Sequence, residues 1–526
     1  MARSTPFQPV IRRLSDDFSI ERVFPHFARR PGCLWFDSVP TSAPSAPHSP
    51  PPPSLGHSSP AENASPAEDV VPLDAAVDLP SARYSYLMSD PLRTLVAEVG
   101  GPDPWPELEA WYRAMPVSEA AGLPPMQGGI AGLLGYEAAT WLERVGLARH
   151  NDLPTPAMSL GLYDWTIATD HHQQQSWLIS QGFCDAADGR VDNRSDARSV
   201  ADRQQRARDR ADQIERQIGI ALQQAPPSAP ACDPRVTCDR DQVSSNFSGA
   251  DFRRAVADVV QRIGAGDSFQ VNLAQRLLHP ALLPSAALYR RLRRTNPAPY
   301  SVYYHGDGFD VLSSSPELFL KLDQRTVQTR PIKGTVPRTG DHEADRRLAE
   351  SLQQSQKDRA ENIMIVDLMR NDLSRVCTDS SVKVRQLCQL ECYQCVQHLV
   401  SIVEGELRDE MSVIDLLKAC FPGGSVTGAP KIEAMRTIAE LEPHRRGPYC
   451  GSMGYISCSG QAEFNILIRT ITATQGQWQL HVGGGITARS NPLSEEAETW
   501  AKAEGLLRAL PAAPPQTSSL PDDAGT

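Results

Sequence analysis

Lys357–Asp372, with the sequence KDRAENIMIVDLMRND, is the stretch that constrains the fold of this chain most tightly. Asp358 and Glu361 stand three residues apart in a helical pattern, so their carboxylates project from one face. The same spacing returns in SEEAETWAKA near the C-terminus, where Glu495 and Glu498 share a face. Two acidic helix faces can supply oxygen ligands to a hard cation such as Mg²⁺. Either pair by itself is more typical of a solvated helix surface.

Two glycine-rich segments are candidate anion sites. Phe421–Lys431 (FPGGSVTGAPK) predicts a turn that leads into a helix with Pro430 at its first position. Free N–H groups at that helix start, together with the Thr427 hydroxyl, could hold a carboxylate, although the Gly-Lys-Ser/Thr ending of a Walker A loop is missing. Val482–Gly485 carries three successive glycines, which let backbone N–H groups approach a ligand. A plain turn remains the alternative for the first segment.

Three further side chains could bind or react. Arg469 lies in an apolar strand pattern (FNILIRT), where a guanidinium either forms a structural salt bridge or holds a ligand carboxylate. His398, in VQHLVS, is either a core histidine or a proton-transfer group. Lys333, in RPIKGTVPR, is either a surface charge or, if desolvated or placed beside other cations, a nucleophile. The residues alone leave these alternatives open.

The composition is that of an ordinary globular protein. Of 526 residues, 40% are hydrophobic and 22% charged, which suffices for a sizeable core in one or more domains. The net charge of -11 disfavours nucleic acid and anionic membranes as partners. No apolar run is long enough to span a membrane and acidic residues occur near the N-terminus, so we expect a cytoplasmic protein without a targeting peptide. The 11 scattered cysteines predict reduced thiols.

Residues 40–66 are rich in Pro, Ser and Ala and predict a disordered insertion. The strand-like segments Gly32–Val39 and Tyr84–Met88 on either side of it are expected to pair. Residues 199–224 predict a charged helix that is followed by a linker. The expected organisation is therefore an N-terminal region over 1–225, a linker over 226–246, a catalytic region over 247–510 and a disordered tail over 511–526.

After residue 247, helical and strand patterns alternate. The predicted helices cover residues 251–263, 343–371, 411–420, 430–441 and 494–509. The predicted strands cover residues 300–304, 311–313, 318–322, 396–404, 453–457, 464–473 and 478–482.

These segments resemble the chorismate-utilising enzymes, the family that includes the component I subunits of anthranilate and aminodeoxychorismate synthases, isochorismate synthase and salicylate synthase. The resemblance spans about residues 250–508, where the family's motifs follow in order: GDSFQVNLAQR, SSSPELF, RPIKGT, KDRAENIMIVDLMRND, HLVS, FPGGSVTGAPK, IRT, GGGI and ETWAKA. Upstream it is looser, through GCLWFDSV, ARYSYLMSDP and GGIAGLLGYE. It implies an α+β fold like that of anthranilate synthase component I, with two packed antiparallel β-sheets flanked by helices.

Within the family, the position of Lys333 separates two activities. Anthranilate-forming members have alanine in this segment, whereas aminodeoxychorismate-forming members have PIKGT, as this chain does. The resemblance thus implies Mg²⁺-dependent conversion of chorismate and ammonia to 4-amino-4-deoxychorismate, the precursor of 4-aminobenzoate and folate. Lys333 would add to ring C2 as the C4 hydroxyl leaves, and ammonia would enter C4 as the lysine departs, with Glu317 as general acid/base. Anthranilate synthesis is the alternative, and an inactive tryptophan-binding scaffold is a remote one.

The resemblance also assigns binding residues. Glu361 and Glu498 match Mg²⁺ ligands, with Asp358 and Glu495 as water-mediated partners, although related enzymes often have Glu where Asp358 stands. The substrate-binding positions are Gly334, Thr335, Tyr449, Arg469, Gly483, Gly484, Gly485 and Lys502, with Thr427 as an adjoining hydroxyl. Lys502 and Mg²⁺ would neutralise a ring carboxylate while Arg469 holds the enolpyruvyl carboxylate. His398 matches a histidine of the anthranilate branch, and its role in a branch that need not eliminate pyruvate stays open.

Two partners follow from the resemblance. The sequence contains no GxCxG nucleophile segment of a class I glutamine amidotransferase, so a separate glutaminase subunit is implied as the source of ammonia. A tryptophan pocket is implied at Ser38, Pro299, Tyr300 and Ser301. In some family members this pocket is a feedback site, and in others it holds a permanently bound structural ligand.

Overall fold

The computed structural model describes residues 7–38, 83–184, 197–224, 238–392 and 396–512. The predicted insertion at 40–66, most of the predicted linker and the tail from residue 513 lie outside the described residues.

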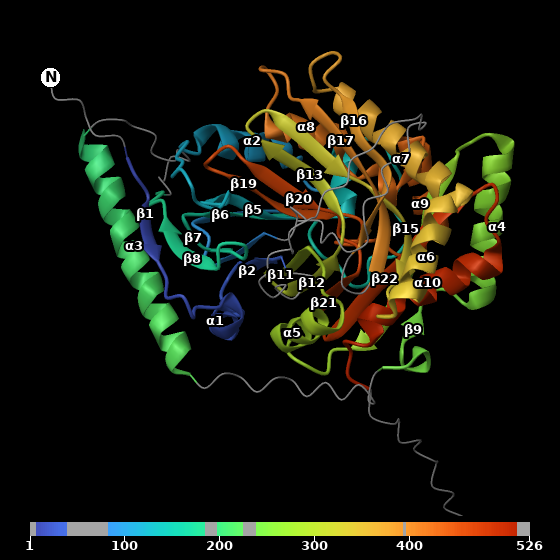
Figure 1. The fold of residues 1–526 in the computed structure, drawn as a ribbon, viewed down its shortest axis with the longest axis horizontal. Helices are drawn as coiled ribbons and strands as arrows, with labels where there is room; N and C mark the ends of the chain where they lie inside the picture. The colour runs from blue at the N-terminus through green and yellow to red at the C-terminus, as the bar shows by residue number, and fades with distance from the viewer. Residues whose placement is uncertain (1–6, 39–82, 185–196, 225–237, 393–395, 513–526) are drawn as a thin grey trace, which may run out of the picture.

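Two antiparallel sheets form the framework of the molecule (Figure 1). Sheet A has 12 strands, in the order β1 (Val10–Arg13), β8 (Gln175–Ser180), β7 (Trp165–Asp170), β3 (Tyr84–Met88), β2 (Leu34–Asp37), β11 (Tyr300–His305), β12 (Phe309–Ser315), β21 (Thr470–Thr474), β22 (Gln477–Thr487), β10 (Gln270–Pro280) and β18 (Gly428–Ala429), with β9 (Ser244–Ser245) paired to β10. Sheet B has 10 strands, in the order β15 (Ile332–Pro337), β17 (Val396–Glu406), β14 (Thr326–Arg330), β13 (Leu318–Asp323), β20 (Ala462–Asn465), β19 (Ser452–Ser457), β5 (Gly129–Leu134), β6 (Met158–Tyr163) and β4 (Arg93–Ala97), with β16 (Lys383–Cys392) paired to β17.

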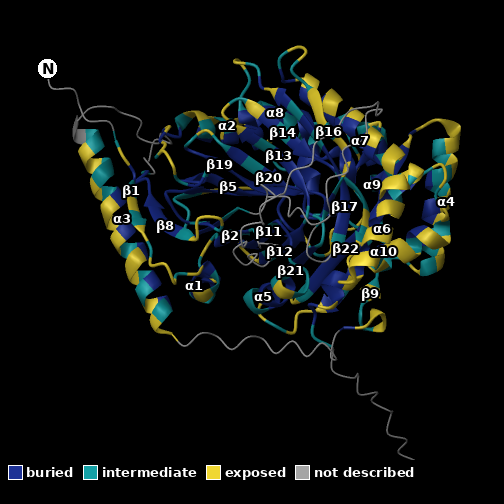
Figure 2. Ribbon diagram, in the orientation of Figure 1, coloured by how far each residue is buried: buried dark blue, intermediate teal, exposed yellow. Residues whose placement is uncertain are grey.

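Helices cover the outer faces of both sheets. They are α1 (Ile20–Phe27), α2 (Trp105–Ala114), α3 (Ala197–Gln223), α4 (Gly249–Ala265), α5 (Ser285–Thr295), α6 (His342–Gln354), α7 (Gln356–Ser374), α8 (Val413–Cys420), α9 (Lys431–Leu441) and α10 (Pro492–Leu507), with 3-10 turns η2 (Tyr136–Trp141), η3 (Arg240–Gln242) and η4 (Gly424–Val426). In Figure 1, α3 lies along β1 and β8, while α4, α6 and α10 gather at the opposite side. Figure 2 shows the strands largely buried and the exposed residues concentrated on the helices.

Three apolar clusters fill the spaces between these layers. Trp35 belongs to the cluster between sheet A and its helices, whereas its neighbour Leu34 belongs to the cluster between the sheets. This alternation is expected of a strand that is buried on both faces. A third cluster packs sheet B against helices such as α7 and α8. Each fully buried large side chain contributes about 1.5–3 kcal/mol through removal from water.

The α+β fold with two packed antiparallel sheets is confirmed. The predicted pairing around the insertion is also confirmed, because β2 pairs with β3 in the register Leu34↔Met88. Strands from both sides of residues 225–237 enter each sheet: β2 pairs with β11 in sheet A, and β5 pairs with β19 in sheet B. The N-terminal region therefore shares both sheets with the rest of the chain.

Three predicted elements were wrong in extent. The helix predicted over 343–371 is two helices, because Ser355 caps α7 by accepting a hydrogen bond from the Asp358 N–H. The strand predicted over 464–473 is split between β20 in sheet B and β21 in sheet A. The strand predicted to end at residue 482 continues through the three glycines to Thr487.

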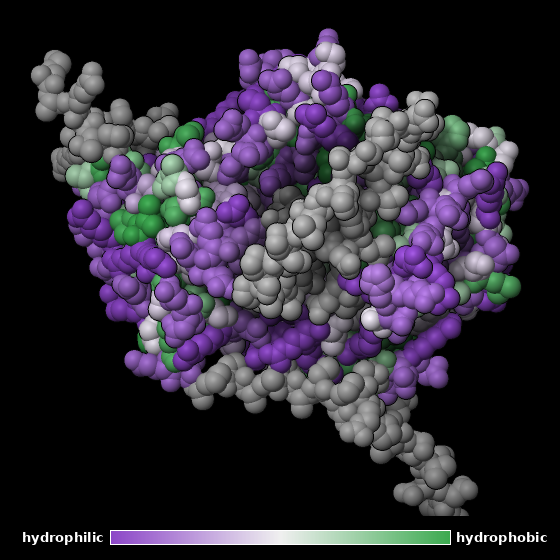
Figure 3. All heavy atoms as spheres, viewed as in Figure 1, coloured by the Kyte–Doolittle hydropathy of each residue, from purple (hydrophilic) through white to green (hydrophobic). Residues whose placement is uncertain are grey.

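No helix among the described residues is both long and apolar enough to cross a membrane. Among the described residues visible in Figure 3, hydrophilic side chains predominate and hydrophobic ones form small groups. The nine cysteines within the described ranges form no disulfide with one another.

Candidate active site

The candidate site lies at a seam where the chain passes from one sheet to the other, at residues 316–317 and again at residues 466–469. Glu317 sits on the first passage and Arg469 on the second. The two passages are joined by hydrogen bonds from the Ile466 N–H to the Glu317 carbonyl (3.0 Å) and from the Ser314 N–H to the Arg469 carbonyl (3.0 Å). Arg469 has a φ of 53°, which a strand residue does not adopt, so its predicted placement inside a strand was wrong.

Glu317 has the environment of a general acid/base. Its side chain is buried, with the residue only 4% exposed. Burial raises its pKa to about 7, while a hydrogen bond from Ser425 and the charge of Lys333 act in the opposite direction. Because this pKa lies near neutrality, the carboxyl group can both donate and accept a proton at physiological pH.

Lys333 lies on β15, which ends the order of sheet B and pairs with β17. The register of this pairing shifts between Lys333 and Thr335, at Gly334. Gly334 has a φ of 75°, and a Cβ there would meet Leu352 Cδ1 at 2.7 Å, so only glycine fits. An irregularity of this kind re-aims neighbouring side chains. The Lys333 ammonium lies against β22, since a Cβ built on Gly485 would be 3.4 Å from its Nζ.

The three glycines of β22 make room for charged groups. A Cβ on Gly484 would lie 3.3 Å from Lys502 Nζ and 3.5 Å from Glu498 Oε1. Lys502 Nζ donates to the Gly483 carbonyl at 2.9 Å and pairs with Glu498 at 2.7 Å. The predicted glycine, lysine and glutamate positions are thus brought together, and burial lowers the pKa of Lys502 although Glu498 opposes this effect.

Helices α7 and α10 place their acidic faces near each other. Lys357 Nζ lies 3.9 Å from Glu361 Oε1 and 3.7 Å from Glu495 Oε1, and it thus bridges the two helices. Burial raises the pKa of Glu361, and the nearby charges of Lys333 and Glu498 also affect this pKa. The predicted metal ligands from distant parts of the sequence therefore share one neighbourhood.

The acidic residues are suitable ligands for a hard cation, although they do not form a complete coordination site. No three His, Cys, Asp or Glu side chains within the described ranges converge as a metal site. Glu361 Oε1, however, is buried without a hydrogen-bond partner, and the donors available are carboxylate oxygens. The Asp358 carboxylate accepts a hydrogen bond from the Ser355 hydroxyl, and the Asp358 side chain lies against Gly334. These residues fit a cation that keeps several waters and takes substrate oxygens.

The remaining predicted residues line the same region, with one difference in role. His398 Nδ1 bonds the Thr335 hydroxyl at 2.8 Å, and burial followed by the charge of Arg469 lowers the His398 pKa to about 4. Arg469 donates to the Lys502 carbonyl, which ties the seam to α10. Tyr449 stacks on His481 with ring centroids 5.2 Å apart. By contrast, the Thr427 hydroxyl donates to the Gly423 carbonyl at 3.1 Å and so serves the turn itself.

Gln270 on β10 is a residue that the sequence analysis missed. Its side chain is 0% exposed, and neither its amide nitrogen nor its amide oxygen has a hydrogen-bond partner among the described residues. A Cβ on Gly485 would lie 2.6 Å from Gln270 Nε2 and 3.4 Å from Lys333 Nζ, so the amide and the lysine occupy one side of the site. The signal available in the sequence was a glutamine within the GDSFQVNLAQR motif.

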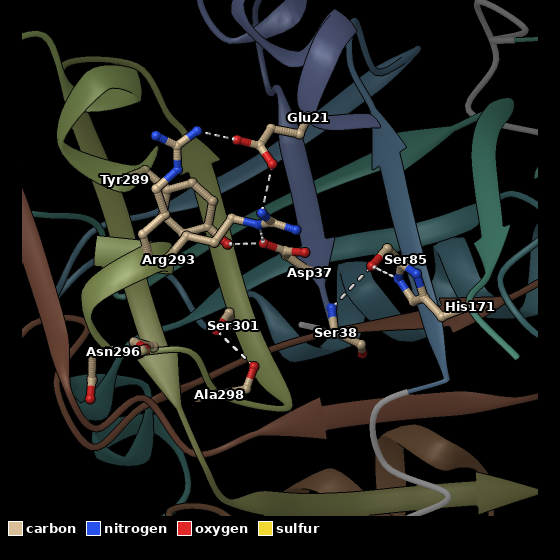
Figure 4. A network of polar contacts seen from close by, with 12 residues as sticks. Glu21, Asp37, Ser38, Ser85, His171, Tyr289, Arg293, Asn296, Ala298 and Ser301 are labelled. Carbon is tan, nitrogen blue, oxygen red and sulfur yellow. Dashed lines mark hydrogen bonds and ion pairs between the residues drawn. The ribbon is translucent and has the colours of Figure 1, made fainter. Parts of the chain in front are cut away.

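A separate open pocket of about 330 Å³ is lined by all four residues that the resemblance assigns to tryptophan. It is lined by Phe36, Asp37, Ser38, Tyr84, Tyr86, Pro299, Tyr300, Ser301, Met453, Tyr455, Glu463 and Asn465. Figure 4 shows the polar network beside it: Arg293 binds Asp37 and Glu21, and Ser85 links the Ser38 N–H to His171. The Ser38 hydroxyl donates to the Pro299 carbonyl at 3.0 Å, which joins β2 to the segment before β11.

Comparison with known proteins agrees with this geometry. Residues 77–508 match the family described as chorismate binding enzyme. The chain belongs to the chorismate binding enzymes. An aminodeoxychorismate synthase component 1 from Salmonella typhimurium is 38% identical over 445 residues, covering 82% of this chain and 90% of that protein. An anthranilate synthase component 1 from Streptomyces coelicolor is 37% identical over 438 residues, covering 82% of this chain and 81% of that protein.

Two solved structures share the fold of this chain. Anthranilate synthase component I from Streptococcus pneumoniae matches with a TM-score of 0.69 and 29% identity, covering 84% of this chain and 95% of that one. The isochorismate synthase MenF from Escherichia coli matches with a TM-score of 0.65 at 19% identity, over 97% of this chain and 96% of that one. The second likeness concerns the fold alone. Members named for different reactions thus have the same architecture, and the site residues must distinguish them.

Proposed function

We propose that this chorismate binding enzyme aminates chorismate at C4, forming 4-amino-4-deoxychorismate from chorismate and ammonia. The observation that carries the proposal is the position of Lys333 on β15, where its charge acts on Glu317 and its amine adjoins Gln270. Relatives named aminodeoxychorismate synthase component 1, from Salmonella typhimurium and Klebsiella aerogenes, are 38% and 39% identical to the chain.

In the proposed reaction, Glu317 and Lys333 work as a pair. Glu317, with its pKa near 7, takes a proton from the Lys333 ammonium, which frees the amine. The Lys333 nitrogen then bonds to ring C2 while both ring double bonds shift and the C4–O bond breaks, and Glu317 gives the proton to the departing hydroxyl, which leaves as water. Ammonia bonds to C4 as the C2–nitrogen bond breaks, and a base accepts the extra proton of the new amine. Two displacements give net retention at C4.

Cationic side chains and a bound metal ion would hold the dianionic substrate. Lys502 and Arg469 supply positive charge beside the three glycines, where backbone groups can approach the ligand. Glu361 and Glu498 would hold Mg²⁺, with Asp358 and Glu495 behind them, and the ion would supply charge that neutralises a substrate carboxylate. His398 is neutral at pH 7 because its pKa is about 4, so it acts as a hydrogen-bonding group rather than a cation.

Ammonia would be received by Gln270 and supplied by a separate class I glutaminase. The Gln270 amide oxygen can accept a hydrogen bond from an incoming amine beside Lys333. The relatives are named as component 1 of their synthases, which supports a second subunit for this chain as well.

The product assay tests this function. Purified protein with chorismate, Mg²⁺ and ammonium salt should accumulate aminodeoxychorismate, detected as 4-aminobenzoate after a lyase is added. Lys333→Ala should abolish that product or divert the reaction to anthranilate, whereas the exposed-lysine control Lys383→Ala should behave as wild type. Anthranilate as the sole wild-type product would overturn the assignment, and undiminished activity of Lys333→Ala would remove the lysine from the mechanism.

Anthranilate synthesis is the second candidate, because relatives of that name are 37% identical to the chain. It would need no lysine nucleophile, and the presence of Lys333 beside Glu317 disfavours it. The same assay separates the two, since anthranilate and 4-aminobenzoate are resolved by chromatography.

The cavity at Ser38, Pro299, Tyr300 and Ser301 is proposed to bind tryptophan. Its aromatic lining suits an indole ring, and Glu463 offers a carboxylate toward an ammonium group, whereas the Asp37 carboxylate is already paired with Arg293. Whether the ligand regulates the chain or only stabilises it is decided by measuring its effect on rate and on melting temperature.

A further inference from the structure

Behind the candidate site lies a buried ion pair that neither the sequence motifs nor the proposed reaction uses. Arg446 and Glu442 have side chains 1% and 3% exposed, and they meet through Nε–Oε2 (2.9 Å) and Nη2–Oε1 (2.6 Å) contacts. We propose that Arg446 is a positioning residue for chorismate: held by Glu442, it fixes Tyr449, the glycine-rich turn and β10 in one arrangement. The inference rests on the proposed function through the assignment of Tyr449 to substrate binding.

The guanidinium joins separate segments of the site. Arg446 Nη1 donates to the Val426 carbonyl (3.1 Å) in the glycine-rich turn, and Nη2 donates to the Asn272 carbonyl (2.6 Å) on β10. Glu442 extends the link, because its Oε1 also accepts the Ala274 N–H at 2.8 Å. Asn272 lies two residues from Gln270 on the same strand, so a shift of Arg446 would be transmitted to the amide beside Lys333.

Aromatic contacts connect Arg446 directly to the proposed substrate residue. Its Cζ lies 5.7 Å from the ring centroid of Tyr449 and 4.7 Å from that of Tyr136. Tyr449 also stacks on His481 at an interplanar angle of 13°. The ring of Tyr449 therefore contacts both His481 and Arg446, and Arg446 ties it to the turn and to β10.

The backbone around Arg446 is fixed as well. The N–H groups of Arg446 and Gly447 donate to the Glu137 carboxylate at 2.8 and 3.0 Å. A buried ion pair is weak evidence for stability, since apolar pairs of similar volume are often as stable. The many directed hydrogen bonds of this guanidinium therefore favour a geometric role, which a lysine could not reproduce.

Arg446 also lines an open pocket of about 350 Å³, and none of the proposed substrate-binding residues lines that pocket. Its lining includes Tyr136, Met435, Ile438, Glu442, His444 and Arg446. A small cation can therefore approach the position of the guanidinium without passing through the substrate site, which makes chemical rescue feasible.

The first test compares variants that separate positioning from stability. Arg446→Lys should raise the KM for chorismate about tenfold to a hundredfold with a smaller change in kcat, because a displaced Tyr449 weakens binding in the ground state and the transition state alike. The double variant Arg446→Met/Glu442→Met should match the wild-type melting temperature more closely than Arg446→Met, yet keep the raised KM. Arg445→Ala, which alters a neighbouring arginine of the same cavity, should leave KM unchanged.

The second test is rescue of Arg446→Ala by added guanidinium. Guanidinium should lower the KM for chorismate several-fold at concentrations that do not alter the wild type, whereas methylammonium should not. A wild-type KM in Arg446→Lys, or a wild-type KM in the stable double variant, would overturn the inference. The KM for chorismate can be measured from whichever product the enzyme forms. A wild-type enzyme that makes anthranilate would therefore refute the proposed reaction, but it would still allow this test of Arg446.

Discussion

Lys333 lies on β15 of sheet B and Glu317 lies on the passage that leads into β13, yet the Lys333 charge acts on the Glu317 carboxyl group and lowers its pKa against the larger effect of burial. The net result is a pKa of about 7, compared with an ordinary value of 4.5. Because its pKa is raised, the Glu317 carboxylate is a stronger base than an ordinary glutamate and can accept a proton from a neighbouring group.

Replacing Glu317 by glutamine should therefore lower kcat about a hundredfold to ten-thousandfold, the usual contribution of a general acid/base. The amide keeps the shape of the side chain, so chorismate affinity should change little. Steady-state kinetics with ammonium salt measure this effect. Glu406→Gln, an exposed glutamate on β17, is the control, and a Glu317→Gln enzyme with wild-type kcat would exclude the carboxyl from proton transfer.

The same pKa makes a prediction about stability. Glu317 binds its proton more tightly in the folded state, where its pKa is about 7, than in the unfolded state, where it is near 4.5. Its contribution is fully present below pH 4.5 and is lost as pH rises to about 7, amounting to roughly 3 kcal/mol. Urea unfolding at pH 5 and pH 8 should show that Glu317→Gln lacks this part of the pH dependence. Identical pH profiles for the two proteins would contradict the raised pKa.

Removal of metal should abolish activity, and loss of either predicted ligand should weaken the response to Mg²⁺. Glu361→Gln and Glu498→Gln should raise the Mg²⁺ concentration needed for half-maximal rate by at least about tenfold. Chelation followed by Mg²⁺ titration measures this, with the melting temperature as a readout independent of turnover. Glu504→Gln, an exposed glutamate on the same helix as Glu498, should titrate as wild type. Equal Mg²⁺ dependence in all three variants would place the ion elsewhere.

Tryptophan should raise the melting temperature of the wild type, since a ligand at a hundredfold excess over its Kd stabilises the folded state by about 3 kcal/mol. Glu463→Gln should reduce that response, because the side chain that lines the cavity at this position would lose its attraction for the ligand ammonium. Tryptophan that copurifies with the protein would already occupy the cavity, so adding more would not change the melting temperature. Mass spectrometry of the denatured protein would reveal such bound tryptophan. An unchanged melting temperature together with no copurified tryptophan would leave the cavity to another ligand.

Sequence patterns anticipated most elements but not the seam. The helix carrying Glu495 and Glu498 was predictable from its spacing, whereas Arg469 was misassigned because an apolar run gives no sign of where a strand leaves one sheet for the other. The glycines of β22 were also open to two interpretations. Glycine is required where a ligand approaches the backbone closely, and it is equally required where a strand packs against charged side chains. Gln270 was missed because an unpartnered amide is visible only in three dimensions.

The stretch Lys357–Asp372 ends in a contact that should matter for stability rather than catalysis. Lys431 Nζ, at the end of the glycine-rich turn, donates to Asp372 Oδ2 at 2.6 Å and to the Cys420 carbonyl at 2.7 Å. Removing one partner of such a buried pair leaves the other charge uncompensated, so Lys431→Met should lower the free energy of unfolding by about 3–5 kcal/mol. Urea unfolding measures the loss, and Lys431→Met/Asp372→Leu should recover much of it. A loss of equal size in the double variant would mean that packing around the turn, and not the unpaired Asp372, sets the cost.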